Sequence, residues 1–170
     1  TREFDDSEIR LLIDSVLFSK TIPQKQCKKL IDKLKGLSNI YFEKKVNHIC
    51  SLPEIRPENK ELFYTIDVLD EAISKGKKVS FIYNSYGTDK KLHPKREREY
   101  VINPYQMVAT NGRYYLICNY DKYDTLSNYR IDRITGIKMM NEKRKKAIAI
   151  MLLIAIMFSV FAPTQNNMAY

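Results

Sequence analysis

The sequence predicts an α+β protein in which a helical block precedes a small β-barrel and an apolar helix follows it. Apolar residues recur at helical spacing up to about residue 75, and from Lys77 short β-rich runs separated by turn residues replace them. Five or six such runs within about 65 residues indicate a small, strongly bent barrel rather than an open sheet. The final block contains 17 residues, Ala147–Pro163, of which only Ser159 is polar.

The first two predicted helices form a hairpin. Asp5–Ser7 can cap a helix over residues 5–19, and Pro23 is suited to the first turn of a second helix that ends near Gly36. Charges of alternating sign on the outer face are typical of a solvated helix surface. The alternative is that this face packs against a partner or a sister subunit.

A connector and a third helix follow. Residues 38–57 contain Pro53 and Pro57 and have weak periodicity, which indicates a connector with one strand at most. A helix is expected from about Asn59 to Lys75, ended by Gly76. Its buried stripe is predicted to contain Leu62, Ile66, Leu69 and Ile73.

The β block begins with the strand Val79–Tyr83, and the charged stretch KKLHPKRERE after it is predicted to be a long hairpin loop. Asn111-Gly112 lies between two β-rich runs and predicts a type I′ hairpin, because both central residues of that turn need positive φ. Further short strands are expected near residues 127–131 and 134–140.

Alternation along the strands assigns their faces. The core face of the strand after Asn111-Gly112 is predicted to carry Tyr114, Leu116 and Cys118. The opposite, ligand-binding face is predicted to carry Arg113, Tyr115, Ile117 and Asn119, and on the next strand Asn128, Arg130 and Asp132. Arg133 has the other parity and can join Arg130 only if a bulge or turn intervenes.

Basic charge is concentrated in the β block. The chain has 29 Lys+Arg and 20 Asp+Glu, a net charge of +9, and residues 77–146 alone contain 16 basic and 7 acidic side chains. Cations neutralise phosphates and aromatic rings stack on bases, so a basic, tyrosine-rich block favours a nucleic-acid or phosphate ligand. The alternative is that the tyrosines pack in the barrel and the lysines are solvated.

Cysteine and histidine usage argues against several classes of function. Cys27, Cys50 and Cys118 show no C-x-x-C spacing, which argues against a disulfide framework and for a reducing compartment, and thus a cytoplasmic location. His48 and Cys50 are too few ligands for zinc. Nucleotide-loop and nucleophile-elbow motifs are missing, so we predict no enzyme, no catalytic residue, no cofactor and no metal site.

The β block resembles a known family. KKVSFIYNSYG, NPYQMV, NGRYYLICNYD and NYRIDRI occur in the order found in the WYL domain of bacterial transcriptional regulators, with Tyr114-Tyr115-Leu116 at the eponymous tripeptide. The resemblance covers roughly Lys77–Met140 and implies an Sm-like barrel that binds an effector, in some members single-stranded nucleic acid. It implies a ligand groove lined by Ser80, Tyr83, Tyr105, Tyr115, Arg130 and Arg133, with Arg98 as a weaker candidate; the parity argument adds Arg113.

The chain departs from such regulators at both ends. Such regulators normally begin with a winged helix-turn-helix, which this sequence lacks. Because the sequence starts at Thr1 rather than Met, we expect a fragment or a processed product. Residues 147–163 follow a basic cluster, Lys143–Lys146, and predict a membrane anchor with the barrel on the cytoplasmic side. The alternatives are a rearranged gene end, a buried helix and a partner interface.

The sequence thus predicts a helical connector at 1–58, a WYL-type barrel with its leading helix at 59–142, and a basic stretch with an apolar tail at 143–170. The predicted function is effector sensing in transcriptional regulation, with a single-stranded nucleic acid or a nucleotide-like molecule as the ligand. A homodimer is a further candidate assembly, and duplex DNA is a partner only if a helix-turn-helix is present. The alternative is a membrane-tethered module that contacts lipid or protein and has no nucleic-acid ligand.

Overall fold

The computed structural model describes residues 3–37, 59–89 and 91–145 of the chain. The predicted strand within 38–57 and the apolar segment 147–163 lie outside these residues. In chain order the elements are α1 (Asp6–Phe18), α2 (Gln24–Lys35), α4 (Leu62–Lys75), β1 (Lys77–Tyr86), β2 (Leu92–Pro94), β3 (Tyr100–Thr110), β4 (Arg113–Asn119), β5 (Ser127–Arg130), a 3-10 turn η1 (Ile131–Arg133) and β6 (Ile134–Lys143).

The helix boundaries follow from their capping residues. Asp5 and Glu8 form a capping box at α1, in which each side chain accepts a hydrogen bond of 2.8 Å from the other's backbone N–H. Pro23 directly precedes α2, and Gly36 caps its C-terminus. Gly76 ends α4 with a φ of +62°, a conformation that glycine adopts without strain. The three predicted helices are therefore confirmed.

The strands form one curled antiparallel sheet. β1 pairs with β3 and with β6, β3 pairs with β4, and β4 pairs with β5. Register shifts interrupt the β1–β6 and β3–β4 pairs, and such bulges increase strand twist. Within the described residues no pairing of β5 with β6 closes the sheet, so it is an open, curled sheet where the sequence predicts a barrel.

The charged stretch after β1 is more ordered than predicted. β1 extends to Tyr86, and β2 pairs with its last residues, from Asn84 opposite Pro94 to Tyr86 opposite Leu92. The prediction of one long loop is wrong here, because cross-strand pairing imposes β structure on residues of low β propensity. The chain then returns through residues 95–99 to β3.

The β3–β4 turn is as predicted. Asn111 has a φ of +51° and Gly112 a φ of +71°, as a type I′ turn requires.

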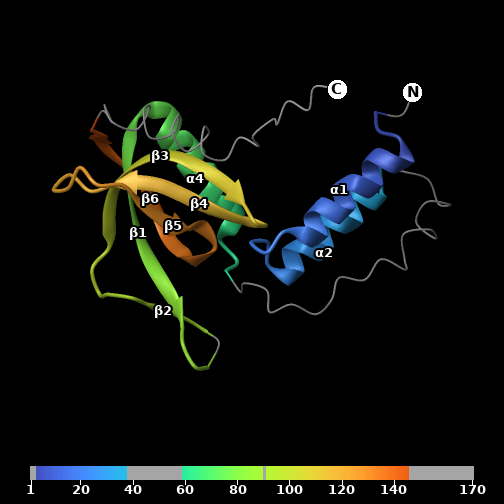
Figure 1. Ribbon diagram of the computed structural model, residues 1–170, viewed down its shortest axis with the longest axis horizontal. Helices are drawn as coiled ribbons and strands as arrows, with labels where there is room; N and C mark the ends of the chain where they lie inside the picture. The colour runs from blue at the N-terminus through green and yellow to red at the C-terminus, as the bar shows by residue number, and fades with distance from the viewer. Residues whose placement is uncertain (1–2, 38–58, 90, 146–170) are drawn as a thin grey trace, which may run out of the picture.

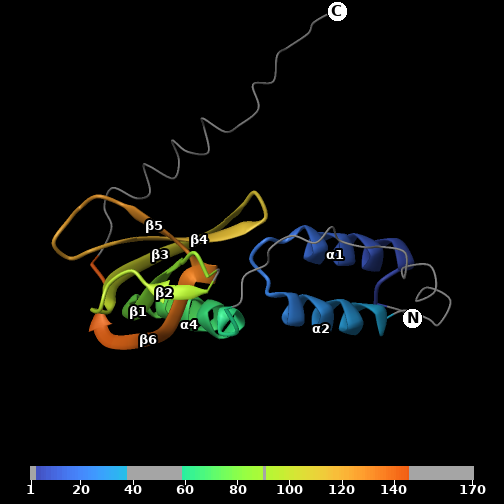
Figure 2. The ribbon, with the colours of Figure 1, turned by 90° about the horizontal axis from the view of Figure 1, so that it is seen from below.

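The described residues form two apolar cores. In the larger one α4 packs against the sheet, around Leu69, Phe81, Leu116 and Ile137. The smaller one lies between α1 and α2, around Ile9 and Ile13. Figures 1 and 2 show the α1–α2 hairpin at one end of the sheet, next to the tip of β3–β4.

Candidate ligand-binding site

A cluster of four aromatic rings lies beneath the predicted site. The Phe81 and Tyr100 rings are stacked with centroids 5.7 Å apart, and the Tyr83 and Tyr129 rings meet edge to face at 4.7 Å. Tyr83 is only 7% exposed. Burial, followed by the hydroxyl–hydroxyl contact with Tyr120, raises the pKa of Tyr129. The Tyr83, Tyr100 and Tyr129 rings therefore pack against one another and against Phe81.

Arg130 is oriented by a buried carboxylate. Its Nε and Nη2 donate hydrogen bonds of 3.0 and 2.6 Å to the two carboxylate oxygens of Asp132, whose side chain is 0% exposed, whereas that of Arg130 is 20% exposed. Burial disfavours the charge on Arg130, but the hydrogen bonds and negative charge of Asp132 outweigh it and raise the pKa of the guanidinium. Arg130 thus keeps a fixed orientation and retains N–H groups that Asp132 does not use.

Tyr115 lies beside Arg130. The two residues are directly opposite in the β4–β5 register, so their side chains lie on the same face of the sheet. Both are half-buried. The backbone N–H of Arg130 also donates to the Tyr83 hydroxyl, at 3.3 Å, which ties this edge of β5 to β1. An aromatic ring and an oriented cation are thereby adjacent.

Arg133 is the last residue of the turn η1, which follows Arg130. The parity of the strand residues requires a bulge or turn of this kind if Arg133 is to join Arg130. Its guanidinium carbon lies 5.8 Å from the centre of the Tyr86 ring. Its backbone carbonyl accepts a 3.0 Å hydrogen bond from the side-chain amide of Asn84. Nε of Arg133 is buried and has no hydrogen-bond partner among the described residues. Arg133 is thus held against the end of β1.

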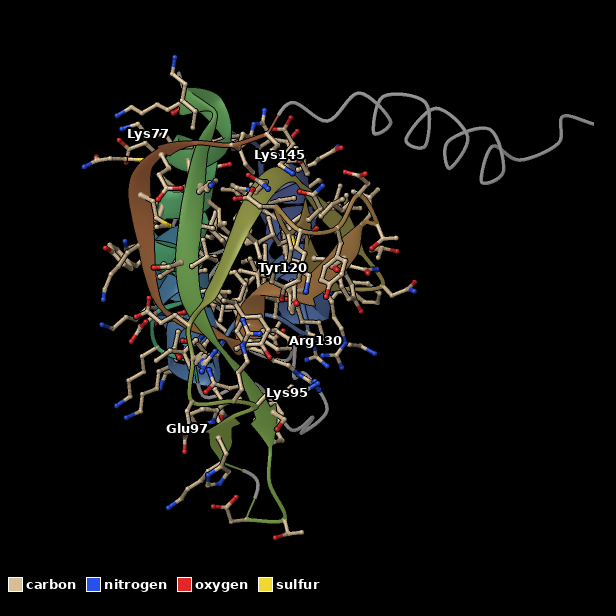
Figure 3. The ribbon with its side chains drawn as sticks, turned by 90° about the vertical axis from the view of Figure 1, so that its left-hand side faces the viewer. Lys77, Lys95, Glu97, Tyr120, Arg130 and Lys145 are labelled. Atoms are coloured by element: carbon tan, nitrogen blue, oxygen red, sulfur yellow. The ribbon has the colours of Figure 1, made fainter. Side chains whose placement is uncertain are left out.

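A basic segment missed by the sequence analysis borders the same ring cluster. Nζ of Lys95 lies 5.6 Å from the centre of the Tyr83 ring, and the guanidinium carbon of Arg96 lies 3.4 Å from that of Tyr100. Figure 3 shows Lys95 and Arg130 toward one end of the sheet, with Lys77 and Lys145 toward the other. The sequence shows the basic charge of KKLHPKRERE, but the resemblance to the family indicates only Arg98 in this stretch, and Arg98 is exposed.

The remaining predicted residues lie apart from Arg130. Ser80 is 6% exposed within β1. Tyr105 donates hydrogen bonds to the side-chain oxygen of Asn119, at 2.9 Å, and to the carbonyl of Lys145, and the guanidinium of Arg144 lies 5.1 Å from the centre of its ring. The Tyr105 ring is therefore already covered by a cation.

Arg113 lies at the tip of β3–β4, where it lines a mainly apolar cavity of about 500 Å³ between the tip and the α1–α2 hairpin. The eight predicted residues thus do not form a single pocket.

Three face assignments differ from the prediction. Tyr114 is 39% exposed, because it lies beside the turn, beyond the edge of the core. Asn119 is 7% exposed and accepts a 3.0 Å hydrogen bond from Asn103, and Asp132 is 0% exposed. The alternation of side chains along a strand does not indicate whether a polar side chain has a hydrogen-bond partner in the interior. Leu116 and Cys118 are buried as predicted.

The sequence model of the WYL domain matches residues 64–139. The chain contains a WYL domain. This match lies within the predicted 59–142 unit and begins inside α4, earlier than the resemblance read from the sequence. No curated protein matches the sequence at a significant level.

Among solved structures, proteasome accessory factor B/C (PafBC) of Arthrobacter aurescens matches with a TM-score of 0.41 and 14% identity, over 85% of this chain and 21% of that one. The chain therefore spans about a fifth of the length of that protein.

The described part of the chain bears on two further predictions. None of its helices is long and apolar enough to span a membrane, and residues 147–163 lie outside it. Its His, Cys, Asp and Glu residues form no group of three that could hold a metal ion.

Proposed function

We propose that the chain is the effector-sensing portion of a WYL-type transcriptional regulator, with a binding rather than a catalytic role. Its ligand would be a nucleic acid or a nucleotide-like molecule on the β4–β5 face. The observation that carries this proposal is the pairing of Tyr115 with Arg130 on one face of the sheet. A ring beside an oriented guanidinium offers base stacking and phosphate binding at one place.

The structure supports different roles for the predicted residues. Arg130 would bind a phosphate through the N–H groups that Asp132 leaves available. A base would stack on Tyr115 rather than on Tyr105, because Arg144 covers the Tyr105 ring. Arg133 would add positive charge beside Arg130 across η1.

Ligand binding would be relayed to the helices through η1. The side-chain amide of Asn59 donates hydrogen bonds of 3.1 and 2.7 Å to the carbonyls of Asp132 and Ile134. Next to it, the carbonyl of Lys60 accepts a 2.9 Å hydrogen bond from Gln26 of α2. A ligand that binds Arg130 more tightly in one arrangement of η1 would therefore shift the position of α2 relative to the sheet. The unit 59–142 would sense and 1–58 would relay.

Fluorescence anisotropy of a labelled single-stranded oligonucleotide, beside the matched duplex, tests the proposal with the 170-residue chain. We expect the single strand to bind more tightly and log K to fall linearly with log salt concentration. Tyr115→Ala should weaken that binding about tenfold or more, the value of one stacked base. Tyr123→Ala is the control, because Tyr123 is 54% exposed and its ring packs on Tyr120 rather than opposite Arg130 in the β4–β5 register.

Anionic phospholipid vesicles provide the second arm of this experiment. Vesicle binding that Tyr115→Ala leaves unchanged, together with no oligonucleotide binding at low salt, would reject the proposal and favour the membrane-tethered module. Equal loss of oligonucleotide affinity in the Tyr115 and Tyr123 variants would show that the face is assigned wrongly.

A further inference from the structure

We infer that Lys95 is a phosphate-binding residue of this site and that Arg96 positions it. The inference rests on the proposed function and names a contact outside the β4–β5 face. Lys95 belongs to the segment between β2 and β3, 35 positions before Arg130 in the sequence. Both residues nevertheless meet at Tyr83.

The backbone of Lys95 is held in place by a hydrogen bond, whereas its ammonium group is not paired with a carboxylate of the described residues. Its backbone N–H donates a 2.9 Å hydrogen bond to the carbonyl of Tyr83, and its Nζ lies 5.6 Å from the centre of the same ring. Its side chain is exposed, and within the described residues it forms no ion pair. By contrast, Lys78 is bound by Asp121 and Glu142, and Lys138 lies near Glu99. Lys95 is thus a cation available to an anionic ligand.

The next residue, Arg96, differs from Lys95 because its charged group is engaged in contacts within the protein. Its guanidinium stacks on the Tyr100 ring, with its carbon 3.4 Å from the ring centre. Nε and Nη2 donate hydrogen bonds of 3.1 Å each to the carbonyls of Arg98 and Glu99. These contacts close the 96–99 segment on itself and anchor it to the aromatic cluster. Arg96 is therefore a positioning residue that keeps Lys95 beside Tyr83.

The placement of the two cations constrains the ligand. Tyr83 contacts Lys95 through its ring and carbonyl and contacts the Arg130 backbone through its hydroxyl. The Lys95 ammonium lies at the Tyr83 ring, whereas Arg130 contacts Tyr83 only through its backbone and directs its guanidinium to Asp132. Because the two cations thus belong to different segments and have different neighbours, one phosphate on each suits a ligand with two phosphates better than a mononucleotide. The site would therefore take a phosphodiester-linked chain along a path from Arg130 to Lys95.

The test is a salt titration of single-stranded oligonucleotide binding with Lys95→Ala in the 170-residue chain. Removal of one phosphate contact should decrease the slope of log K against log salt by about 0.7, and the affinity about fivefold at 0.1 M salt. Lys95→Arg should restore the slope. Lys122→Ala is the matched control, because Nζ of Lys122 also lies 5.6 Å from a tyrosine ring, that of Tyr123, and should leave the slope unchanged.

The role of Arg96 is tested with a double-mutant cycle. Arg96→Ala should weaken binding about as much as Lys95→Ala, and the double variant should bind no more weakly than either, because Arg96 acts through Lys95. If the losses of binding free energy in the two single variants add up in the double variant, Arg96 contacts the ligand itself, and its positioning role is overturned. Urea unfolding midpoints of all variants establish that each is folded.

The outcomes separate this inference from the proposed function. If Arg130→Ala weakens binding while Lys95→Ala leaves the salt slope unchanged, the proposed function stands and the Lys95 contact is rejected. If the unmodified chain binds no oligonucleotide at low salt, both are rejected. If both variants decrease the slope and a mononucleotide binds as tightly as a dinucleotide, the two-phosphate path is wrong.

Discussion

Asp132 illustrates how one buried carboxylate determines the geometry of a surface cation. Its side chain is 0% exposed, and both of its oxygens accept hydrogen bonds from Arg130. Asp132→Asn would leave the Arg130 charge without its partner in a partly buried position, which costs about 3 kcal/mol of unfolding free energy. Urea unfolding measures this loss.

The control for Asp132 is Asp14→Asn in α1. Asp14 pairs with Arg10 at 3.1 Å, but their side chains are 45% and 41% exposed, so the loss should not exceed about 0.5 kcal/mol. Equal losses in the two variants would contradict the structural role given to Asp132.

Cys118 makes stability depend on pH above neutrality. Burial raises the pKa of its thiol from 9.0 to about 12. Above pH 9 the unfolded chain releases this proton and the folded chain retains it, so unfolding free energy falls as pH rises, by about 1 kcal/mol between pH 8 and pH 10. Urea unfolding of Cys118→Ala at both pH values should show a smaller decrease than the unmodified chain. Buried tyrosines contribute to both chains and cancel in the difference.

At the scale of elements, the β3–β4 turn contacts the helical hairpin. Gly112 has a φ of +71°, and a Cβ there would lie 2.9 Å from the carbonyl oxygen of Phe18. Gly112→Ala should therefore destabilise the protein more than Gly136→Ala, whose φ is +60° but whose Cβ would lie 3.8 Å from the nearest atom, on Ile82. We expect about 1 kcal/mol for Gly136→Ala, from backbone strain alone, and a larger loss for Gly112→Ala. Equal unfolding midpoints would show that the turn does not press on the hairpin.

Local signals explain which elements could be predicted. The Asp5 capping box, Gly76 and Asn111-Gly112 act over a few residues, so the helix ends and the turn follow from the sequence. β2 could not be predicted, because its pairing with β1 is a tertiary contact. For the candidate site, strand parity predicts only that Tyr115 and Arg130 each lie on the outward face of their own strand. Their direct pairing depends on the β4–β5 register, and Lys95 reaches Tyr83 only through the fold.

At the scale of the whole molecule, both an apolar contact and polar contacts join the helical hairpin to the sheet. Ile22, in the connection between α1 and α2, packs against the larger core. The Thr21 hydroxyl accepts a 3.1 Å hydrogen bond from the Tyr114 N–H and donates one of 3.4 Å to the Gly112 carbonyl. The Lys20 N–H donates to the same carbonyl at 2.6 Å. Ile9 and Ile13 lie in a different core from Leu69, so opening of the hairpin would expose the core under the sheet only where Ile22 packs against it.

Thr21→Val should uncouple the two cores. Thr21 is 1% exposed, and valine keeps its shape but leaves the Tyr114 N–H without its partner, a loss of about 1–3 kcal/mol. In hydrogen exchange read by mass spectrometry, amides of α1 should exchange faster in the variant while those of α4 stay unchanged. Ser15→Ala is the control, because among the described residues its hydroxyl donates within α1, to the Leu11 carbonyl. Faster exchange in α1 and α4 alike would mean that the molecule opens as one cooperative unit, and a hairpin relay would then have no independent motion to use.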